Sequence, residues 1–307
     1  MGKIFELGRN TKSIHGWIII DKPKGYSSTN IVNRIKKILQ VKKAGHAGTL
    51  DPNATGILAI AIGEATKTIQ YLMDAPKEYN FSMILGTGTD TDDSTGCIIK
   101  SSEKRPSNIA LKKKLKNFEG LISQVPPNFS AVRVKGQRAY KLSRGGNLDL
   151  KLKARNLWVE KLTFIDRISD DEVELNLVCG KGGYVRSIAR DLGKSLGCYA
   201  HVENLRRIRS GPFNLDDAME PSFIECENAE KILSFLKPIF PNLKDTSMLS
   251  CNKKEAELLK NGISIKIENL KINGSGQIVF VKCQETPVAI CVYHDGVIKP
   301  KRVFLLD

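Results

Sequence analysis

The sequence has few of the features that stabilise secreted or membrane-embedded proteins. Its seven cysteines are scattered through the 307 residues, and no two of them have C-x-x-C spacing. The odd number and the irregular spacing argue against a disulfide framework and against a zinc site. No apolar run approaches the length of a membrane span, and the first residues lack the apolar core of a signal peptide. We therefore expect a soluble cytoplasmic protein with reduced thiols and no membrane partner.

Negative charge is scarce relative to positive charge. The chain carries 48 lysines and arginines against 33 aspartates and glutamates, for a formal net charge of +15 and a pI of about 9.4. Such an excess of positive charge indicates the kind of binding partner rather than the fold. Nucleic acid is the first candidate, because basic side chains bind phosphates. An anionic membrane surface is second, and a solubility bias is the alternative without a specific partner. Hydrophobic residues make up 41% of the chain, enough for a sizeable core.

Helical and strand patterns are interspersed along the chain, without an internal repeat or a low-complexity tract. Apolar spacing predicts strands at 16–20, 56–62, 79–85 and 205–209, and helices at 28–39, 64–73, 108–118 and 184–196. Alternation at 157–165 and 172–179 predicts a pair of antiparallel strands. These patterns favour an α+β fold with a mixed, largely antiparallel sheet and flanking helices.

Composition divides the chain into regions. The stretch 237–245 carries two prolines and is the expected linker between a large domain, 1–236, and a small β-rich domain, 246–307. Residues 124–155 are basic and poorly patterned, which predicts a flexible insertion with one short helix near 137–143. Its cations and aromatic rings suit RNA phosphates and bases, whereas a solvated loop is the simpler alternative. The candidate RNA-binding residues are Arg133, Lys135, Arg138, Lys141 and Arg144.

One carboxylate stands in an unusual setting. Asp51 lies within GHAGTLDPNATGILAI, where the neighbouring residues are small and Pro52 follows at once. Small neighbours let a large flat group approach the backbone, and a carboxylate held there can act as nucleophile or general base. The alternative is that Asp51 merely opens a turn, as aspartate before proline often does.

Two further stretches carry charge at suggestive spacing. In KGGYVRSIARDLG, Arg186 falls in the first turn of a predicted helix and can pair with a carboxylate and keep it ionised. An ordinary surface arginine is the alternative there. The acidic turn formed by Asp90, Asp92 and Asp93 lacks the length and closing glutamate of a calcium loop, so we interpret it as structural.

Taken together, five stretches resemble the TruB family of tRNA pseudouridine synthases. They run in the family's order from about residue 16 to residue 303, with the basic insertion in its expected place. The stretches are GWIIIDKPKGYSS, GHAGTLDPNATGILAIAIGEATK, KEYNFSMILGTGTDTDDSTG, KGGYVRSIARDLGKSLGCYAHVENLRRIRSG and KPKRVF.

The resemblance implies a fold and an activity. The fold would be a pseudouridine synthase catalytic domain with a PUA-like RNA-binding domain at the C-terminus. The activity would be isomerisation of uridine 55 in the T arm of tRNA to pseudouridine, without metal, nucleotide or redox cofactor. The target base would be flipped out of its loop, and its glycosidic C–N bond would be exchanged for a C–C bond.

The resemblance also implies roles for individual residues. Asp51 would be the catalytic carboxylate, attacking sugar or base or acting as a base itself, and Arg186 would pair with it. Tyr79 would lie against the target ring, and His46 would occupy the space that the flipped base leaves. Flat side chains suit such stacking, and His46 has no neighbouring second ligand for a metal. The pocket would be lined by Lys22, Tyr184 and Leu205.

Three alternatives remain open from the sequence. One is a non-catalytic tRNA-binding or tRNA-folding protein that uses the same cleft. Another is the guide-RNA-dependent branch of the family, which the short N-terminus and the absence of long lysine-rich tails disfavour. The third is a metal-dependent hydrolase built on the acidic turn. We expect a stand-alone monomer that needs no protein partner, because nothing resembles a heptad seam or an exposed apolar helix.

Overall fold

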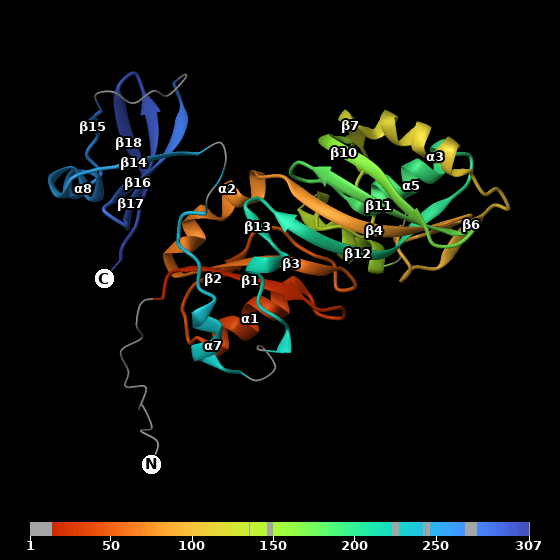
Figure 1. The fold of residues 1–307 in the computed structure, drawn as a ribbon, viewed down its shortest axis with the longest axis horizontal. Helices are drawn as coiled ribbons and strands as arrows, with labels where there is room; N and C mark the ends of the chain where they lie inside the picture. The colour runs from red at the N-terminus through yellow and green to blue at the C-terminus, as the bar shows by residue number, and fades with distance from the viewer. Residues whose placement is uncertain are drawn as a thin grey trace, which may run out of the picture.

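The computed structural model describes residues 14–134, 136–145, 150–222, 227–241, 243, 246–267 and 275–306. Within them, a nine-stranded mixed sheet forms the larger body and a five-stranded sheet the smaller one (Figure 1). The large sheet has the order β1-β3-β12-β4-β11-β10-β7, with β2 paired to β3 and β13 to β12. Its strands are β1 (Gly16–Lys22), β2 (Ala44–His46), β3 (Thr55–Ile62), β4 (Lys77–Leu85), β7 (Gly120–Gln124), β10 (Arg155–Arg167), β11 (Glu172–Cys179), β12 (Ala200–Ser210) and β13 (Phe213–Asn214).

The first part of the sheet is a short apolar unit. β1 and β3 pair antiparallel along their full length, and nearly every side chain in them is buried. Helix α1 (Ser28–Ile38) begins at Ser27, whose side chain accepts a hydrogen bond from the Asn30 amide. Its apolar face, with Ile31 and Ile35, packs against the isoleucines of this unit, as the helical spacing of the sequence predicts. The unit thereby becomes a rigid base for the loop between β2 and β3.

The second part of the sheet is built from long antiparallel strands. β12, β4, β11 and β10 are neighbours, and helix α5 (Val185–Ser195) packs on them around Ile188 and Leu192. The helix has its C-cap at Leu196, and Gly197 follows with φ of +70°, a backbone conformation that glycine adopts without strain. β12 pairs parallel with β3 at Arg206 and Arg207, so this strand joins the two parts.

The small C-terminal sheet has the order β14-β16-β17-β18-β15. Phe240 stacks on Phe280 where this sheet meets the larger body, and Phe304 lies edge-on to Phe240. Tyr71 is edge-on to Phe280 at 5.3 Å between ring centroids. The expected linker is partly packed rather than free, since Lys237 and Trp17 exchange backbone hydrogen bonds. The elements are β14 (Ser247–Ser250), α8 (Lys253–Lys260), β15 (Ile265–Lys266), β16 (Gln277–Cys283), β17 (Thr286–His294) and β18 (Val297–Val303).

The remaining elements connect these two bodies or lie on their surface. The helix expected at 64–73 is a 3-10 turn, η1, followed by a short α-helix, α2, while β7, α7 and β14 were not expected. The α+β fold with a largely antiparallel sheet is confirmed. These elements are η1 (Gly63–Thr68), α2 (Ile69–Asp74), β5 (Thr87–Thr89), β6 (Ile98–Ser101), α3 (Asn108–Leu115), η2 (Lys116–Phe118), β8 (Arg133–Val134), β9 (Gln137–Arg138), α4 (Ala139–Arg144), η3 (Leu215–Asp217) and α7 (Ala229–Ser234).

Candidate active site

The loop between β2 and β3, residues 47–54, carries Asp51 and is called the Asp51 loop below. The buried hydroxyl of Ser28 donates to the Leu50 carbonyl at 2.9 Å and accepts from the Leu50 amide at 2.8 Å. On the other side of Asp51, the Pro52 carbonyl accepts from the Gly25 amide at 2.8 Å. The residues on both sides of the carboxylate are therefore fixed to α1 and to the turn that precedes it.

Lys22 lies under the same loop. Its side chain is fully buried, and its Nζ donates to the carbonyls of Pro23, Tyr26 and Pro52. Burial lowers the pKa of Lys22 to about 8, although the negative charge of Asp51 opposes that effect. The sequence predicted Lys22 as a pocket-lining residue, and the structure places its amine among backbone carbonyls beside the Asp51 loop.

Arg186 pairs with Asp51 across more than a hundred residues of sequence. Its Nη2 lies 2.9 Å from Asp51 Oδ2, and the guanidinium also donates to the carbonyls of Thr91 and Phe129. The Arg186 side chain is 6% exposed, whereas that of Asp51 is 41% exposed. A buried fork of this kind holds a carboxylate in one orientation while the carboxylate stays open to a ligand. The pairing that the sequence predicted is therefore present.

The acidic turn between β5 and β6 supplies a second layer around this pair. Asp93 Oδ2 lies 3.5 Å from Arg186 Nη1, and Asp92 Oδ2 lies 2.8 Å from Arg190 Nη1. Burial raises the pKa of Asp92, against the opposing charge of Arg190. Both carboxylates face arginines of α5, so the turn helps to set how this helix presents Arg186.

Tyr79 and His46 lie on strands that border the loop. Tyr79, on β4, is buried, and burial raises the pKa of its hydroxyl while the nearby Arg207 guanidinium opposes the rise. His46, the last residue of β2, has its pKa lowered by burial and then by Arg207. Within the described residues, its Nδ1 is buried without a hydrogen-bond partner. The two rings thus belong to one electrostatic neighbourhood, in which Asp51 also acts on Tyr79.

Tyr184 and Leu205 lie on the elements that flank the pair. Tyr184 precedes α5, and its backbone exchanges two hydrogen bonds with the Gln124 side chain. Burial raises the pKa of the Tyr184 hydroxyl, and Arg186 and Asp51 are both near enough to affect it. Leu205, on β12, lies opposite Phe81 of β4 and packs partly buried against the main core. Tyr184 thus lies beside the ion pair of Asp51 and Arg186, and Leu205 lies on the large sheet.

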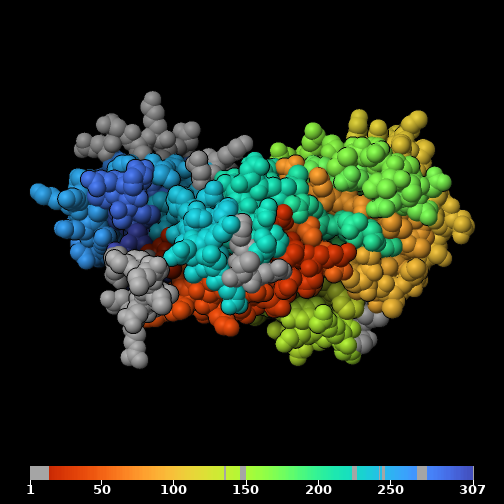
Figure 2. Space-filling view, turned by 60° about the horizontal axis from the view of Figure 1, so that its bottom comes forward, coloured from red at the N-terminus to blue at the C-terminus, as the bar shows by residue number. Residues whose placement is uncertain are grey.

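The basic insertion is attached to the same helix. The Val125 carbonyl accepts from Ser187 and Arg190, and the Phe129 carbonyl from Arg186. Beyond these anchors it forms β8, β9 and α4, and Figure 2 shows the yellow-green region around residue 140 projecting from the surface. Lys135 lies outside the described residues. The other predicted RNA-binding residues are exposed: Arg133, Arg138, Lys141 and Arg144.

Sequence reasoning missed three residues that shape the site. Neither Ser28 nor Arg207 was predicted as a site residue, and Asp93 was considered only as part of a turn. Arg207 is 1% exposed, with Nε donating to the Ile57 carbonyl at 2.7 Å and Nη2 to the Gly48 carbonyl at 3.0 Å. A polar residue that binds backbone carbonyls distant in sequence leaves no local pattern, so periodicity and composition did not identify Arg207.

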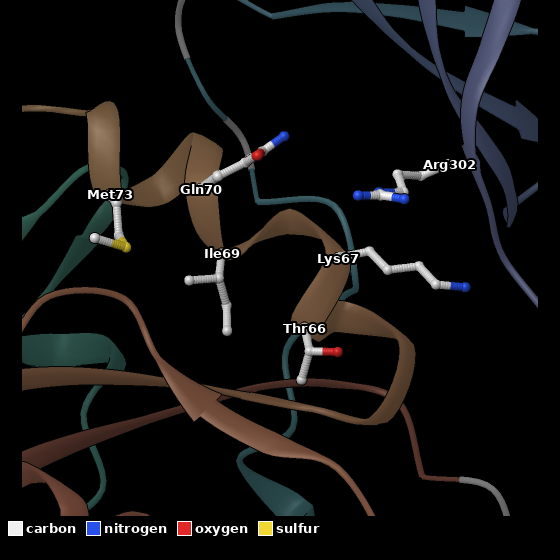
Figure 3. Close-up of a pocket in the computed structure, with 6 residues that line it drawn as sticks. All are labelled: Thr66, Lys67, Ile69, Gln70, Met73 and Arg302. Atoms are coloured by element: carbon white, nitrogen blue, oxygen red, sulfur yellow. The ribbon is translucent and has the colours of Figure 1, made fainter. Parts of the chain in front are cut away.

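A groove elsewhere on the molecule is not part of this site. It has a volume of about 470 Å³ and lies between η1, α2 and β18 (Figure 3). None of the predicted site residues lines it, and it lies where the two bodies meet. Its lining residues are Thr66, Lys67, Ile69, Gln70, Met73 and Arg302. Neither Asp51 nor Arg186, which form the ion pair described above, lines this groove.

No helix among the described residues has both the length and the apolar character needed to span a bilayer.

Comparisons with known proteins match the chain over almost its whole length. The model for the TruB family pseudouridylate synthase N-terminal domain matches residues 36–185, and that for the tRNA pseudouridylate synthase B C-terminal domain matches residues 186–239. The protein named tRNA pseudouridine synthase B from Ruegeria pomeroyi is 48% identical over 297 residues, 96% of this chain and 97% of that protein. The protein of the same name from Ehrlichia chaffeensis is 43% identical, covering 95% of this chain and 99% of that protein.

A solved structure, described as an H/ACA RNP bound to a substrate RNA containing 2′-deoxyuridine, has a TM-score of 0.72. It is 23% identical and covers 94% of this chain and 85% of that one, a likeness that concerns the fold alone. The family models and the relatives agree with the five stretches quoted from the sequence. The chain belongs to the TruB family of pseudouridine synthases, which are isomerases that make pseudouridine.

Proposed function

We propose that this protein isomerises uridine 55 in the T arm of tRNA to pseudouridine, in the cytoplasm, as a monomer without guide RNA or protein partner. Its relatives are named for tRNA as substrate. The observation that carries the proposal is the ion pair in which a buried Arg186 holds a half-exposed Asp51 at 2.9 Å. A protein that only binds RNA would have no need to keep this acid, because an unpaired carboxylate would repel RNA phosphates.

The chemistry follows from the product. The bond between C1′ and N1 of uridine breaks, the base turns over, and a bond between C1′ and C5 forms. C5 loses a proton and N1 gains one, so atoms and electrons balance without any co-substrate. In the proposal Asp51 is the catalytic carboxylate, and it either attacks the sugar or the base or acts as a base itself. Tyr79 lies against the ring while the proton leaves C5.

The base reaches Asp51 only after it leaves its stack. Extrusion costs a few kcal/mol, and side chains that stack with the base and fill the vacated space offset it. His46 takes that space in the proposal, and its pKa, lowered by burial and then by Arg207, favours the neutral ring, as suits a ring among bases. Arg186 pairs with Asp51, while Lys22, Tyr184 and Leu205 complete the pocket.

RNA binding is assigned to two regions. The exposed cations of the insertion, which we place at 124–155, track the phosphates of the T arm. The PUA-like domain at 246–307 supplies a further RNA contact, and 1–236 is the catalytic domain. A guide-dependent enzyme would need a second RNA to present its target. Four exposed cations on an arm anchored to the α5 helix of the site favour direct contact with tRNA instead.

The proposal is tested with purified protein and an unmodified T-arm hairpin or whole tRNA transcript. Tritium release from [5-³H]uridine reports the reaction, and filter binding reports affinity. The wild type should release one equivalent from position 55 without added RNA or protein, and a transcript with cytidine at 55 should release none from that position. Asp51→Asn should bind the hairpin and make no product. Light scattering of the active enzyme reports the oligomeric state.

A matched control is Asp170→Asn, because Asp170 is an exposed carboxylate in the turn between β10 and β11. It should react as the wild type does. Undiminished product from Asp51→Asn would refute the catalytic assignment. Activity that requires a guide RNA would refute the stand-alone assignment while leaving the family membership intact.

A further inference from the structure

Arg207 is a buried cation that the reaction as proposed leaves without a role. It is 1% exposed and is among the largest fully buried side chains. Within the described part of the chain, no carboxylate lies within ion-pair distance of it. Its neighbour Arg206 forms a forked pair with Asp21, and Arg209 pairs with Glu78. Taking a charge out of water without an anion is costly, so Arg207 calls for an explanation that its neighbours do not.

The hydrogen bonds of Arg207 reach both ends of the segment that carries Asp51. Nη2 donates to Gly48, three residues before Asp51, and Nε donates to Ile57, six residues after it. The backbones also approach closely here, since a Cβ on Gly56 would lie 2.2 Å from the Arg207 carbonyl oxygen. One side chain on β12 therefore binds the start of the Asp51 loop and the strand β3 that follows the loop.

Arg207 also lies beside the two rings assigned to the target base. It is the cross-strand partner of Tyr79 in the pairing of β12 with β4, so both side chains stand on one face of the sheet. On β2, the ring of His46 lies within its electrostatic reach, and so do the amines of Lys22 and Lys77.

We infer that Arg207 is a positioning residue for the reaction, which from β12 holds the backbone at Gly48 and Ile57, on either side of Asp51, and sets the environment of Tyr79 and His46. This inference rests on the proposed function, because it assigns those two rings to the uracil. Its positive charge opposes protonation of His46 and favours release of the Tyr79 proton, which also faces Cys179 and Asp51. The same group thus couples the geometry of the loop to the protonation of the rings.

The first measurement needs no RNA. The sequence has four histidines, so imidazole resonances can be titrated by NMR and that of His46 identified from its loss in His46→Gln. In Arg207→Gln the pKa of His46 should rise toward the ordinary value for histidine, because the nearby charge is gone. In Arg207→Lys the charge remains and the His46 titration should stay close to that of the wild type. A His46 titration unchanged in folded Arg207→Gln overturns the electrostatic part of the inference.

The second measurement is steady-state kinetics on the T-arm hairpin. Arg207→Gln should lower kcat on the order of 100-fold with little change in KM, as expected when a catalytic group shifts by about 1 Å. Arg207→Lys should lower kcat by about 10-fold, since an amine lacks the fork that reaches two carbonyls. The matched control is Arg209→Gln, which removes the same charge from the same strand and should keep kcat within about 3-fold.

Several outcomes decide the inference. A wild-type kcat in folded Arg207→Gln overturns it. A fall in kcat that only matches the loss of folded protein, with the His46 titration unchanged, also overturns it. Should Arg207→Gln fail to fold, Arg207→Lys carries the test, because a wild-type kcat there overturns it and a lowered kcat per folded molecule supports it. If the wild type makes no pseudouridine in tRNA, the proposed function fails, while the His46 titration still shows whether Arg207 governs that ring.

Discussion

The cations around the Asp51 loop and those of the basic insertion differ in solvent exposure and in the groups that they contact. Lys22, Arg186 and Arg207 are buried and are held by backbone carbonyls or by carboxylates. The described cations of the insertion are exposed, and one of them, Arg144, lies 5.8 Å from the ring centroid of Tyr140. Buried cations cost free energy and fix geometry, whereas exposed cations attract phosphates and are screened by salt. The net charge of +15 therefore combines two kinds of cation, buried ones that fix geometry and exposed ones that can attract phosphates.

The largest effect is expected at Arg186. Arg186→Met should reduce kcat on the order of 10²–10³-fold, because Asp51 loses the donor that orients it. The free energy of unfolding should fall by about 3 kcal/mol, since the carbonyls of Thr91 and Phe129 lose their donor and Asp93 loses its ion-pair partner. Single-turnover assays and urea denaturation measure the two effects.

The matched variant is Arg190→Met, one helical turn along α5. Arg190 is also mostly buried and pairs with Asp92, so a similar loss of stability is expected. Its guanidinium does not contact Asp51, so kcat should stay within about 10-fold of the wild type. Equal losses of activity in both variants would mean that Arg186 acts through the fold alone.

The buried amine of Lys22 predicts a dependence of stability on pH. Its pKa is about 8 in the folded protein, below the usual 10.5, so between those values the unfolded chain binds more protons than the folded one. Stability attributable to Lys22 therefore rises with pH across that window, and the cost of the buried charge is fully present below pH 8.

This window can be measured against a variant. The difference in free energy of unfolding between the wild type and Lys22→Met should move in favour of the wild type by up to about 3 kcal/mol from pH 7.5 to 10. Lys24→Met supplies the matched replacement at an exposed site of the same turn. A difference that is flat with pH would show that Lys22 is solvated rather than held as a buried cation.

Exposed cations should respond to salt instead. Replacing Arg133, Arg138 and Lys141 by glutamine should weaken tRNA binding and lower the slope of log Kd against log salt by about 2 to 3, if each contacts one phosphate. The kcat at saturating tRNA should remain, because the ion pair of Asp51 is with Arg186 and not with any of these side chains. The control replaces Lys113, Lys114 and Lys116 of the α3–η2 segment. An unchanged salt slope in the insertion variant would contradict its role as a phosphate clamp.

The same contrast explains what the sequence could predict. Charges on an exposed segment form a local pattern, so the insertion and its short helix could be predicted from the local sequence. Apolar periodicity placed β1, α1, β4 and α5 because their buried faces repeat along the chain. Asp51 and Arg186 were found through stretches that resemble a known family, and their pairing follows from that resemblance.

The contacts that fix the site could not be predicted from the sequence. Ser28 binds Leu50 and Arg207 binds Gly48 across 22 and 159 residues respectively. Their partners are backbone groups, which every residue possesses, so no residue type marks them. The packing of the expected linker against Trp17 escaped notice because two prolines are as compatible with a docked segment as with a free one.

The smallest effect is expected where two adjacent serines differ only in what they bind. Ser28 holds both backbone groups of Leu50, whereas Ser27 caps α1 by accepting from Asn30. Ser28→Ala should cost about 1–3 kcal/mol of stability, because a buried amide loses its acceptor, and should lower kcat by about 10-fold as the Asp51 loop loosens. Ser27→Ala should cost about 1 kcal/mol and leave kcat unchanged, since a helix cap does not position the carboxylate. Thermal unfolding and kcat, measured on both variants, separate loop positioning from helix stability. Equal kcat values in the two variants would show that the Asp51 loop keeps its position without Ser28. The buried cations would then be sufficient to hold the loop.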